Sequence, residues 1–517
     1  MSNTRKTIFL LVLLVLLSVL EPPAGRAQAA AATPQVLLLF DSEAKGTPQE
    51  GNIMELQRLL AAYSIKVTVV SLDQYEPGGM AAYSHRITVI NAPDIAVTNR
   101  SYLEDAGNYK GQELHVGYNP PDRLKQALKL STDIMHGGSV GLFAGRLSGA
   151  SLSVQEMPYI TAAEGKKDYG RLVFQGVGLQ APYAVSAGRY TYVPYLEQGN
   201  VSVLAMAGVL REWLGSTAVP QTYFVLKEIY PFSDLALLEE TAERLYEAGI
   251  PFIASVRPVF SNTDYPAMLR YLEALKVVQS RNGSILVNAP VVMPSISGSD
   301  DTLGAKMSGF VDLLVKNGIA PLGMGAEIYW TYDKEYAAAG MGWFDSAVLF
   351  PDERLMHRER TNRSTAFESS LYSLPLEFLQ NLHTSGKVMP AFPLDTAVTA
   401  NLPEDEAGLT ELLERLDGYW ISFADYKQEE HRVVTDTNKV VSSRGNITLN
   451  GQHLNVDYSA RNQVSDDYQY TEEQQKSFTK LFNVQNQFFI VVIIICLLFF
   501  GGLLIIGYRM YRKKYLK

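Results

Sequence analysis

The chain has 517 residues, a length that allows about three domains. Hydrophobic residues make up 47% of the chain and charged residues 19%. A disordered chain would be poorer in apolar residues, and a multi-pass membrane protein would be richer in them. The single cysteine excludes intrachain disulfides, thiolate zinc sites and iron–sulfur clusters. The net charge of −9 argues against nucleic acid as a partner.

The N-terminus has the pattern of a secretory signal peptide. Arg5 and Lys6 precede an apolar run from Ile8 to Leu20, which is shorter than the roughly 20 residues that span a bilayer. Ala27-Gln28-Ala29 then supplies a small-x-small cleavage site. We therefore expect residues 1–29 to be a signal peptide, with an uncleaved N-terminal anchor as the alternative.

The C-terminus predicts a single transmembrane helix over residues 488–507. Phe488–Ile506 contains no charged side chain, and residues 508–517 form a basic tail. Cations behind a membrane span favour the cytoplasmic side, so the ectodomain is expected to be extracellular or periplasmic. Cys496 lies inside this helix and cannot be a catalytic thiol of the ectodomain. The polar segment 461–487 is expected to be a stalk.

Alternating strands and helices predict a parallel α/β sheet over residues 34–215. The pattern resembles a flavodoxin-like or glutamine-amidotransferase-like layer, although no nucleophilic cysteine is available. The expected strands are short runs rich in apolar and β-branched residues, at Gln35–Phe40, Lys66–Val70, Arg86–Ile90 and Val140–Phe143.

A second α/β series over residues 220–430 predicts a (β/α) barrel. Ser233-Asp234 can cap one of its helices, and Pro266 can open the next. The expected strands are Tyr223–Leu226, Pro251–Val256, Ser284–Val287, Met324–Tyr329, Ala347–Phe350 and Gly418–Phe423. Beyond the barrel, residues 431–460 alternate polar and apolar side chains around a turn at Asn450-Gly451, which predicts a small β-hairpin appendage.

The segment Tyr223–Phe260, most specifically Tyr230-Pro231-Phe232, Gly249-Ile250-Pro251-Phe252 and Pro258-Val259-Phe260, resembles an uncharacterised bacterial membrane-anchored family of the polysaccharide deacetylase superfamily. The resemblance implies a distorted (β/α) barrel. It also implies a metal site made by two acidic residues after the first strand and a His-x-x-x-His motif after a later one, where a metal-bound water attacks an acetyl carbonyl.

The sequence departs from the superfamily at these metal-site positions. Lys227-Glu228 stands where the paired aspartates belong, and Asn288-Ala289-Pro290 stands where the histidine motif belongs. An ammonium group repels a divalent cation, and an amide is a weak ligand compared with imidazole. We therefore predict no metal and no cofactor, and a degenerate catalytic site.

Several polar residues follow predicted barrel strands, where such folds place their functional groups. The residues expected to meet at the barrel mouth are Lys227, Glu228, Arg257, Asn288, Glu327 and Asp425, with Tyr230, Tyr329 and Trp330 as a sugar-stacking surface. Lys227 and Glu228 are neighbours on a strand, so at most one points inward unless a bulge intervenes. A structural ion pair or a solvated rim is the alternative interpretation. The acidic loop Ser297–Asp301 could hold a cation, or be only a loop.

These features predict an exported, membrane-anchored protein that binds or scaffolds cell-envelope polysaccharide without catalysis. The enzymatic alternative is a deacetylase with an atypical site, or a glycosidase that uses Glu228 and Glu327 with their carboxyl groups about 5–9.5 Å apart. A third possibility is a partner of other envelope proteins in polymer export.

Overall fold

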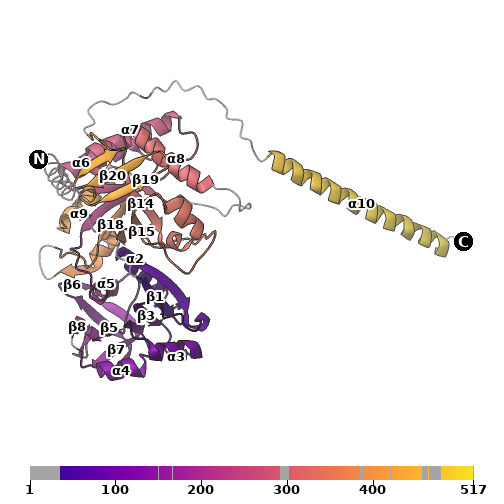
Figure 1. Cartoon of the computed structure of the whole chain (residues 1–517). Coiled ribbons are helices and arrows are strands. Elements are labelled where there is room, and N and C mark those ends of the chain that lie inside the picture. Colours follow the sequence, from indigo (N-terminus) through magenta and orange to yellow (C-terminus); the bar gives the residue numbers. More distant parts are fainter. Residues whose placement is uncertain are drawn as a thin grey trace, which may run out of the picture. The chain divides into compact units, whose positions relative to one another are not determined.

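The computed structural model describes residues 35–149, 151–165, 167–290, 302–384, 389–419, 421–456, 464 and 479–515. The chain divides into two units, Met1–Val464 and Ser465–Lys517 (Figure 1). The predicted signal peptide 1–29 and the acidic loop Ser297–Asp301 lie outside the described residues. Most of the predicted stalk 461–487 lies outside them too, and its last residues belong to a helix.

The N-terminal part of the first unit begins with a parallel α/β layer, as the sequence predicts. Its four strands pair in the order β4, β3, β1, β2. They are β1 (Gln35–Phe40), β2 (Lys66–Ser71), β3 (His85–Ile90) and β4 (Gln112–Gly117), and the helices between and after them are α2 (Asn52–Ala62), α3 (Arg100–Asn108) and α4 (Asp122–Leu128). β1 is apolar and buried through Val36–Leu39, whereas β3 and β4 also bury charged side chains, which include the ion pair between Arg86 and Glu113.

The rest of this sheet is antiparallel, so the prediction of a wholly parallel sheet is wrong. The additional strands are β5 (Ser131–Ala144), β6 (Leu147–Gly149), β7 (Leu152–Ala162), β8 (Lys167–Phe174), β9 (Gln180–Ala187) and β10 (Tyr190–Val193), followed by helix α5 (Ser202–Trp213). β10 joins the two halves, because it pairs with β4 in parallel and with β9 antiparallel. Strand β17 (Leu382–Thr384), from far along the chain, extends the sheet at β6.

The following segment forms a closed parallel barrel of seven strands, which confirms the predicted barrel. The strands are β11 (Thr222–Ile229), β12 (Phe252–Val256), β13 (Gly283–Asn288), β14 (Pro321–Glu327), β15 (Ser346–Phe350), β16 (Ser369–Pro375) and β18 (Thr396–Asn401). The helices are α6 (Leu235–Glu247), α7 (Pro266–Ser280), α8 (Thr302–Lys316) and α9 (Glu406–Gly418). Asp234 caps α6 as predicted, because its carboxylate accepts from the backbone N–H groups of Ala236 and Leu237.

The predicted last strand Gly418–Phe423 is wrong. Gly418 ends helix α9, and the described residues that follow it up to Asp425 form no strand. β18 closes the barrel instead, between β16 and β11. The backbone N–H of Ala424 donates to the carbonyl of Thr222, at the start of β11, so this segment runs along the N-terminal end of the barrel.

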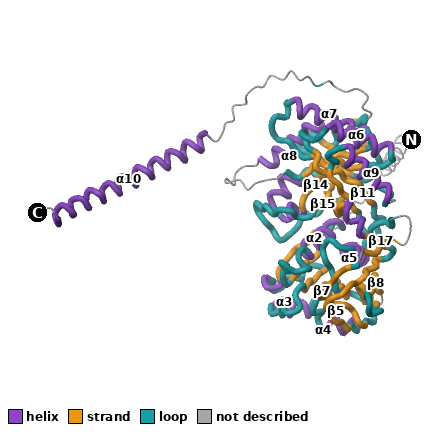
Figure 2. Tube along the Cα trace, turned by 180° about the vertical axis from the view of Figure 1, so that it is seen from behind, coloured by secondary structure: helices purple, strands orange, loops and turns teal. Residues whose placement is uncertain are grey.

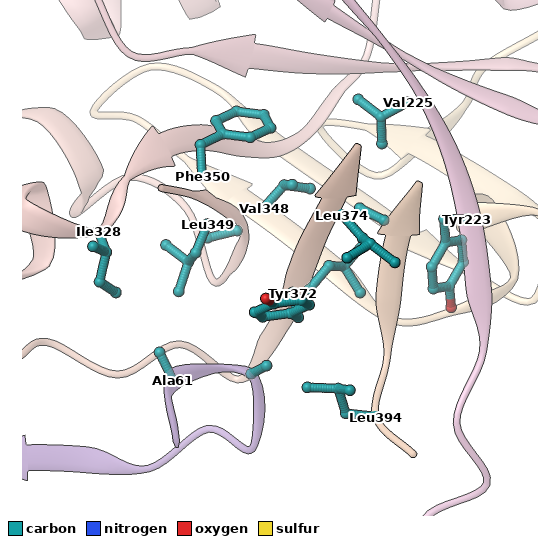
Figure 3. Packing of buried hydrophobic residues seen from close by; sticks show 14 of the residues in the cluster. Ala61, Tyr223, Val225, Ile328, Val348, Leu349, Phe350, Tyr372, Leu374 and Leu394 are labelled. Carbon is teal, nitrogen blue, oxygen red and sulfur yellow. The ribbon is translucent and has the colours of Figure 1, made fainter. Parts of the chain in front are cut away.

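Helix α2 of the N-terminal part packs directly on barrel strands β15 and β16. In Figures 1 and 2, α2 lies between the barrel strands and the N-terminal sheet. Figure 3 shows Ala61 of α2 beside Tyr372 of β16, within a hydrophobic cluster that also contains Leu349 and Leu374 of the barrel. The two parts therefore share one core.

A four-stranded antiparallel sheet follows the barrel. Its strands are β19 (His431–Val434), β20 (Lys439–Ser443), β21 (Asn446–Leu449) and β22 (Gln452–His453). Asn450 and Gly451 both have positive φ angles between β21 and β22, the geometry that the Asn-Gly pair favours in a two-residue hairpin turn. Val433, Val440 and Ile447 face the shared core.

The second unit contains helix α10 (Thr479–Tyr515). Within it, Phe489–Lys514 is the one segment of the described chain that is helical, long and apolar enough to cross a membrane.

Candidate site at the barrel mouth

The C-terminal ends of the barrel strands bring most of the predicted site residues to one end of the barrel. A Cβ atom on Gly325 would lie 3.3 Å from the Ser255 hydroxyl and 3.2 Å from the Leu286 side chain, so these three positions face the barrel interior. Side chains two residues further along a strand point to the same side. Arg257, Asn288 and Glu327 therefore point toward the mouth.

Strand β11 brings both Lys227 and Glu228 to the mouth because it is bulged there. Its pairing with β12 shifts between Leu226 and Ile229, and Glu228 has a φ of 61°. A non-glycine residue in this left-handed region is uncommon and re-aims its side chain. The Lys227 ammonium lies 5.5 Å from the centre of the Phe350 ring, which belongs to the end of β15.

The Glu228 carboxylate is the centre of a compact polar cluster. Nη2 of Arg257 donates to its Oε1 at 3.1 Å, and the hydroxyl of Tyr230 donates to its Oε2. Nη1 of Arg257 donates to the carbonyl of Ala289 at 2.8 Å, which fixes the guanidinium between β12 and β13. We refer to Glu228, Tyr230 and Arg257 as the Glu228 cluster.

The pKa values of the two predicted catalytic carboxyl groups, Glu228 and Glu327, are shifted in opposite directions. Burial would raise the pKa of Glu228, but the Tyr230 hydrogen bond and the Arg257 charge outweigh it and hold the pKa below its usual value. Burial raises the pKa of Glu327, against hydrogen bonds that include one from the backbone N–H of Glu353 to its Oε2 at 3.3 Å. Both carboxyl groups lie within the field of Arg257.

The donor groups at the mouth do not fit the metal site of the deacetylase superfamily. The Glu228 carboxylate is already bound by a guanidinium, and Lys227 adds a second positive charge nearby. Asn288 offers only an amide where imidazoles would be needed. Among the described residues, no group of three or more His, Cys, Asp or Glu side chains is placed to hold a metal ion.

Asp425 does not belong to this site, and its prediction is wrong. It follows a segment at the N-terminal end of the barrel, and its Oδ1 lies 2.9 Å from Nζ of Lys427. Lys427 in turn donates to Asn282, in the turn before β13. The prediction failed because it depended on a strand at Gly418–Phe423 that the chain does not form.

Trp330 does not belong to a sugar-binding surface either. Its side chain is 1% exposed and stacks on Tyr336, with ring centres 4.6 Å apart. Gly340 packs against the edge of the indole, since a Cβ there would lie 2.5 Å from Cζ3 of the ring. Tyr329, its neighbour, is also largely buried but lines a large cavity beside the mouth.

Two residues that the sequence reasoning missed lie near the predicted ones. Phe232 is 82% exposed and stacks on Tyr230 with ring centres 4.7 Å apart. Its signal was the Tyr-Pro-Phe motif just after β11. Asp352 follows the end of β15, and its Oδ1 accepts from the backbone N–H of Tyr329 at 2.9 Å. Asp352 is the first polar residue after the predicted strand Ala347–Phe350. The rule that selected the other site residues, which takes polar residues that follow predicted strands, could therefore have found it.

No protein-family model matches the sequence. An uncharacterised protein of Bacillus subtilis strain 168, YdaL, is 29% identical over 220 residues, which cover 36% of this chain and 38% of the relative. The match therefore spans well under half of that protein's length. Among solved structures, the carbohydrate deacetylase Agd3 aligns with 81% of this chain and 91% of its own, at 8% identity and a TM-score of 0.33. A TM-score of this size does not establish a shared fold.

Asp352 makes the stability of the globular unit depend on pH. Burial raises its pKa to about 7, and the nearby Glu327 charge adds to this effect. The folded state keeps a proton that the unfolded state loses near pH 4, so stability should fall as pH rises from about 4 to about 7, by at most about 1.4 kcal/mol per unit. Asp352→Asn should remove this slope, as measured by urea denaturation of the full chain at pH 5 and pH 8. An unchanged slope, equal to that of the exposed control Asp73→Asn, would contradict the assignment.

Proposed function

We propose that the chain is an exported, membrane-anchored protein whose deacetylase-like barrel binds cell-envelope polysaccharide at its mouth, without a metal-dependent reaction. The observation that carries the proposal is the exposed Phe232 ring, which stacks on Tyr230 beside the Glu228 cluster. Sugar rings bind through their C–H faces to aromatic rings and through their hydroxyl groups to charged hydrogen-bonding groups. The mouth offers both surfaces side by side.

Helix α10 supports the membrane-anchored part of the proposal. Its segment Phe489–Lys514 is long enough to cross a bilayer, and basic residues lie at its C-terminal end. The leader-like residues 1–29 favour export of the globular unit. The excess of acidic residues in the chain suits neutral or cationic glycans better than anionic ones.

Phe232→Ala should weaken binding of an N-acetylglucosamine hexamer about tenfold, or 1.4 kcal/mol, because it removes an exposed aromatic contact. Isothermal titration calorimetry of the full chain in detergent measures this loss. The thermal midpoint should stay unchanged, since the side chain is solvent-exposed. Leu269→Ala removes another exposed apolar side chain, on α7, and is the matched control. Equal affinity of both variants would place the glycan elsewhere.

A glycosidase is the second candidate, because Glu228 and Glu327 have pKa values shifted in opposite directions near the same guanidinium. Glycoside hydrolysis uses one carboxyl group with a raised pKa as the acid and a second that stays ionised. Shortened oligosaccharides on incubation with the protein, lost with both Glu228→Gln and Glu327→Gln, would favour this candidate. Acetate release without shortening would instead favour a deacetylase with an atypical site.

A further inference from the structure

A cavity of about 950 Å³ lies between the N-terminal sheet and the barrel. One wall comes from the ends of β1 and β2 and the start of α2, including Phe40 and Gln57, and the other comes from the segments after β14 and β15, including Tyr329 and Asp352. We refer to it as the interdomain cavity. Its volume is in the range of small-molecule sites, which often form between two parts of a protein.

The interdomain cavity adjoins the barrel mouth. Glu353 lines the cavity, and its backbone N–H donates to the Glu327 carboxylate at the end of β14. Asp352 also lines the cavity, and the charge of Glu327 acts on its carboxyl group. The segment 352–353 therefore belongs to the lining of the cavity and also contacts the end of β14 at the mouth.

The carboxyl groups at this boundary are not balanced by cations. Two guanidinium groups act on them, but Arg257 is paired with Glu228 at 3.1 Å and Arg58 with Glu55 at 3.0 Å. Within the described ranges, no ion pair joins Glu327, Asp352 or Glu353 to a lysine or arginine. Carboxyl groups crowded together in a partly buried place favour a cation beside them.

Three basic residues also line the cavity: Lys45 follows β1, and His357 and Arg360 belong, like Asp352, to the segment after β15. Lys45 is paired with Glu43 at 2.8 Å and lies within the field of Arg360. Arg360 also acts on His357, whose pKa is lowered mainly by burial.

A second feature independently indicates a polar ligand. The Tyr332 side chain is 5% exposed and lines the cavity, and its hydroxyl lies near Gln57 and Ser364 without forming a hydrogen bond of good geometry to any described residue. A buried hydroxyl without a partner is costly unless something else satisfies it. Gln74 and Gln198 add amide groups to the lining, and Phe40 and Tyr329 add aromatic surface.

We propose that the interdomain cavity is a second saccharide subsite that selects a sugar carrying a protonated amino group. The ammonium would lie against Asp352, with Glu327 next to it at the end of β14, and the sugar hydroxyls would lie toward Tyr332 and the glutamine amides. This inference rests on the proposed glycan binding at the mouth. It adds an amino-sugar preference that the Glu228 cluster, with its own guanidinium, does not supply.

The test compares a β-1,4-linked glucosamine hexamer with its fully N-acetylated counterpart, by calorimetry on the full chain in detergent at pH 6. The glucosamine hexamer should bind at least about tenfold more tightly. Asp352→Asn keeps the hydrogen bond from the Tyr329 N–H but cannot give up a proton to face the ammonium, as the Asp352 carboxyl group must on binding at pH 6. The variant should therefore abolish this preference by weakening binding of the glucosamine hexamer. Asp73→Asn removes one exposed carboxylate outside the cavity and should preserve the preference.

The outcomes separate this inference from the proposed function. Equal binding of the two hexamers by the unmodified chain, or a preference that persists in Asp352→Asn, would overturn the subsite while glycan binding at the mouth stands. Binding of neither hexamer would overturn both. If Asp73→Asn also lost the preference for the glucosamine hexamer, the preference would come from the overall negative charge of the protein, and the subsite would be overturned.

Discussion

Replacing Arg58 by alanine is expected to destabilise the globular unit by about 3–5 kcal/mol, because it leaves a buried carboxylate without its cation. The Arg58 and Glu55 side chains are 4% and 1% exposed, and they join at 3.0 Å on helix α2. Arg58 also donates to the carbonyl and hydroxyl of Ser373 on barrel strand β16, and its guanidinium lies 4.4 Å from the centre of the Tyr372 ring. The Tyr372 hydroxyl donates to Glu55. Urea denaturation of the full chain measures the loss.

Two control variants test whether the loss of stability comes from the unpaired buried charge of Glu55. Lys334→Ala breaks an ion pair with Glu359 in which the lysine side chain is 71% exposed, so it should leave the free energy of unfolding nearly unchanged. Glu55→Met combined with Arg58→Met removes both buried charges and should cost less than Arg58→Ala alone. A loss below about 1 kcal/mol for Arg58→Ala would mean that water reaches Glu55, and that α2 is not fixed on the barrel by this network.

The Arg58 network explains why the N-terminal part is needed beside the barrel. Between β15 and β16, and again between β16 and β18, the described chain forms no α-helix. A parallel strand needs cover on both faces, and α2 gives that cover to β15 and β16. The interdomain cavity exists because the same arrangement brings the ends of β1 and β2 to the segments after β14 and β15.

The sequence predicts the barrel well because its strands are locally distinctive. Phe252–Val256 and Gly283–Asn288 are buried along their whole length, and continuous apolar runs of this kind predict parallel strands. The starts of α6 and α7 are also predicted from neighbouring residues alone, by the capping Asp234 and by the proline in the first turn of α7. By contrast, strand β5 is largely polar and exposed before Val140, so no apolar pattern marks its first half.

The site was predictable only in part, for a related reason. The rule that functional groups follow parallel strands found Glu228, Arg257 and Glu327, which lie at strand ends. It left open whether a bulge lies at Lys227-Glu228, because a single non-glycine residue with positive φ has no sequence signature. It could not foresee the interdomain cavity, because residues as far apart as Phe40 and Asp352 form it, and no local spacing reports such a contact.

Trp330→Ala is expected to lower the stability of the globular unit by about 3–5 kcal/mol, the usual cost of removing a large buried aromatic side chain. The indole is 1% exposed and packs against Tyr336 and Gly340, so the substitution leaves a cavity that its neighbours can fill only in part. At a temperature where the variant is still folded, its affinity for the N-acetylglucosamine hexamer should equal that of the unmodified chain. Phe232→Ala should show the reverse, with affinity lost and stability kept. If Trp330→Ala instead lost affinity at unchanged stability, the indole would be reaching the glycan, and the sugar-stacking role expected from the sequence would be restored.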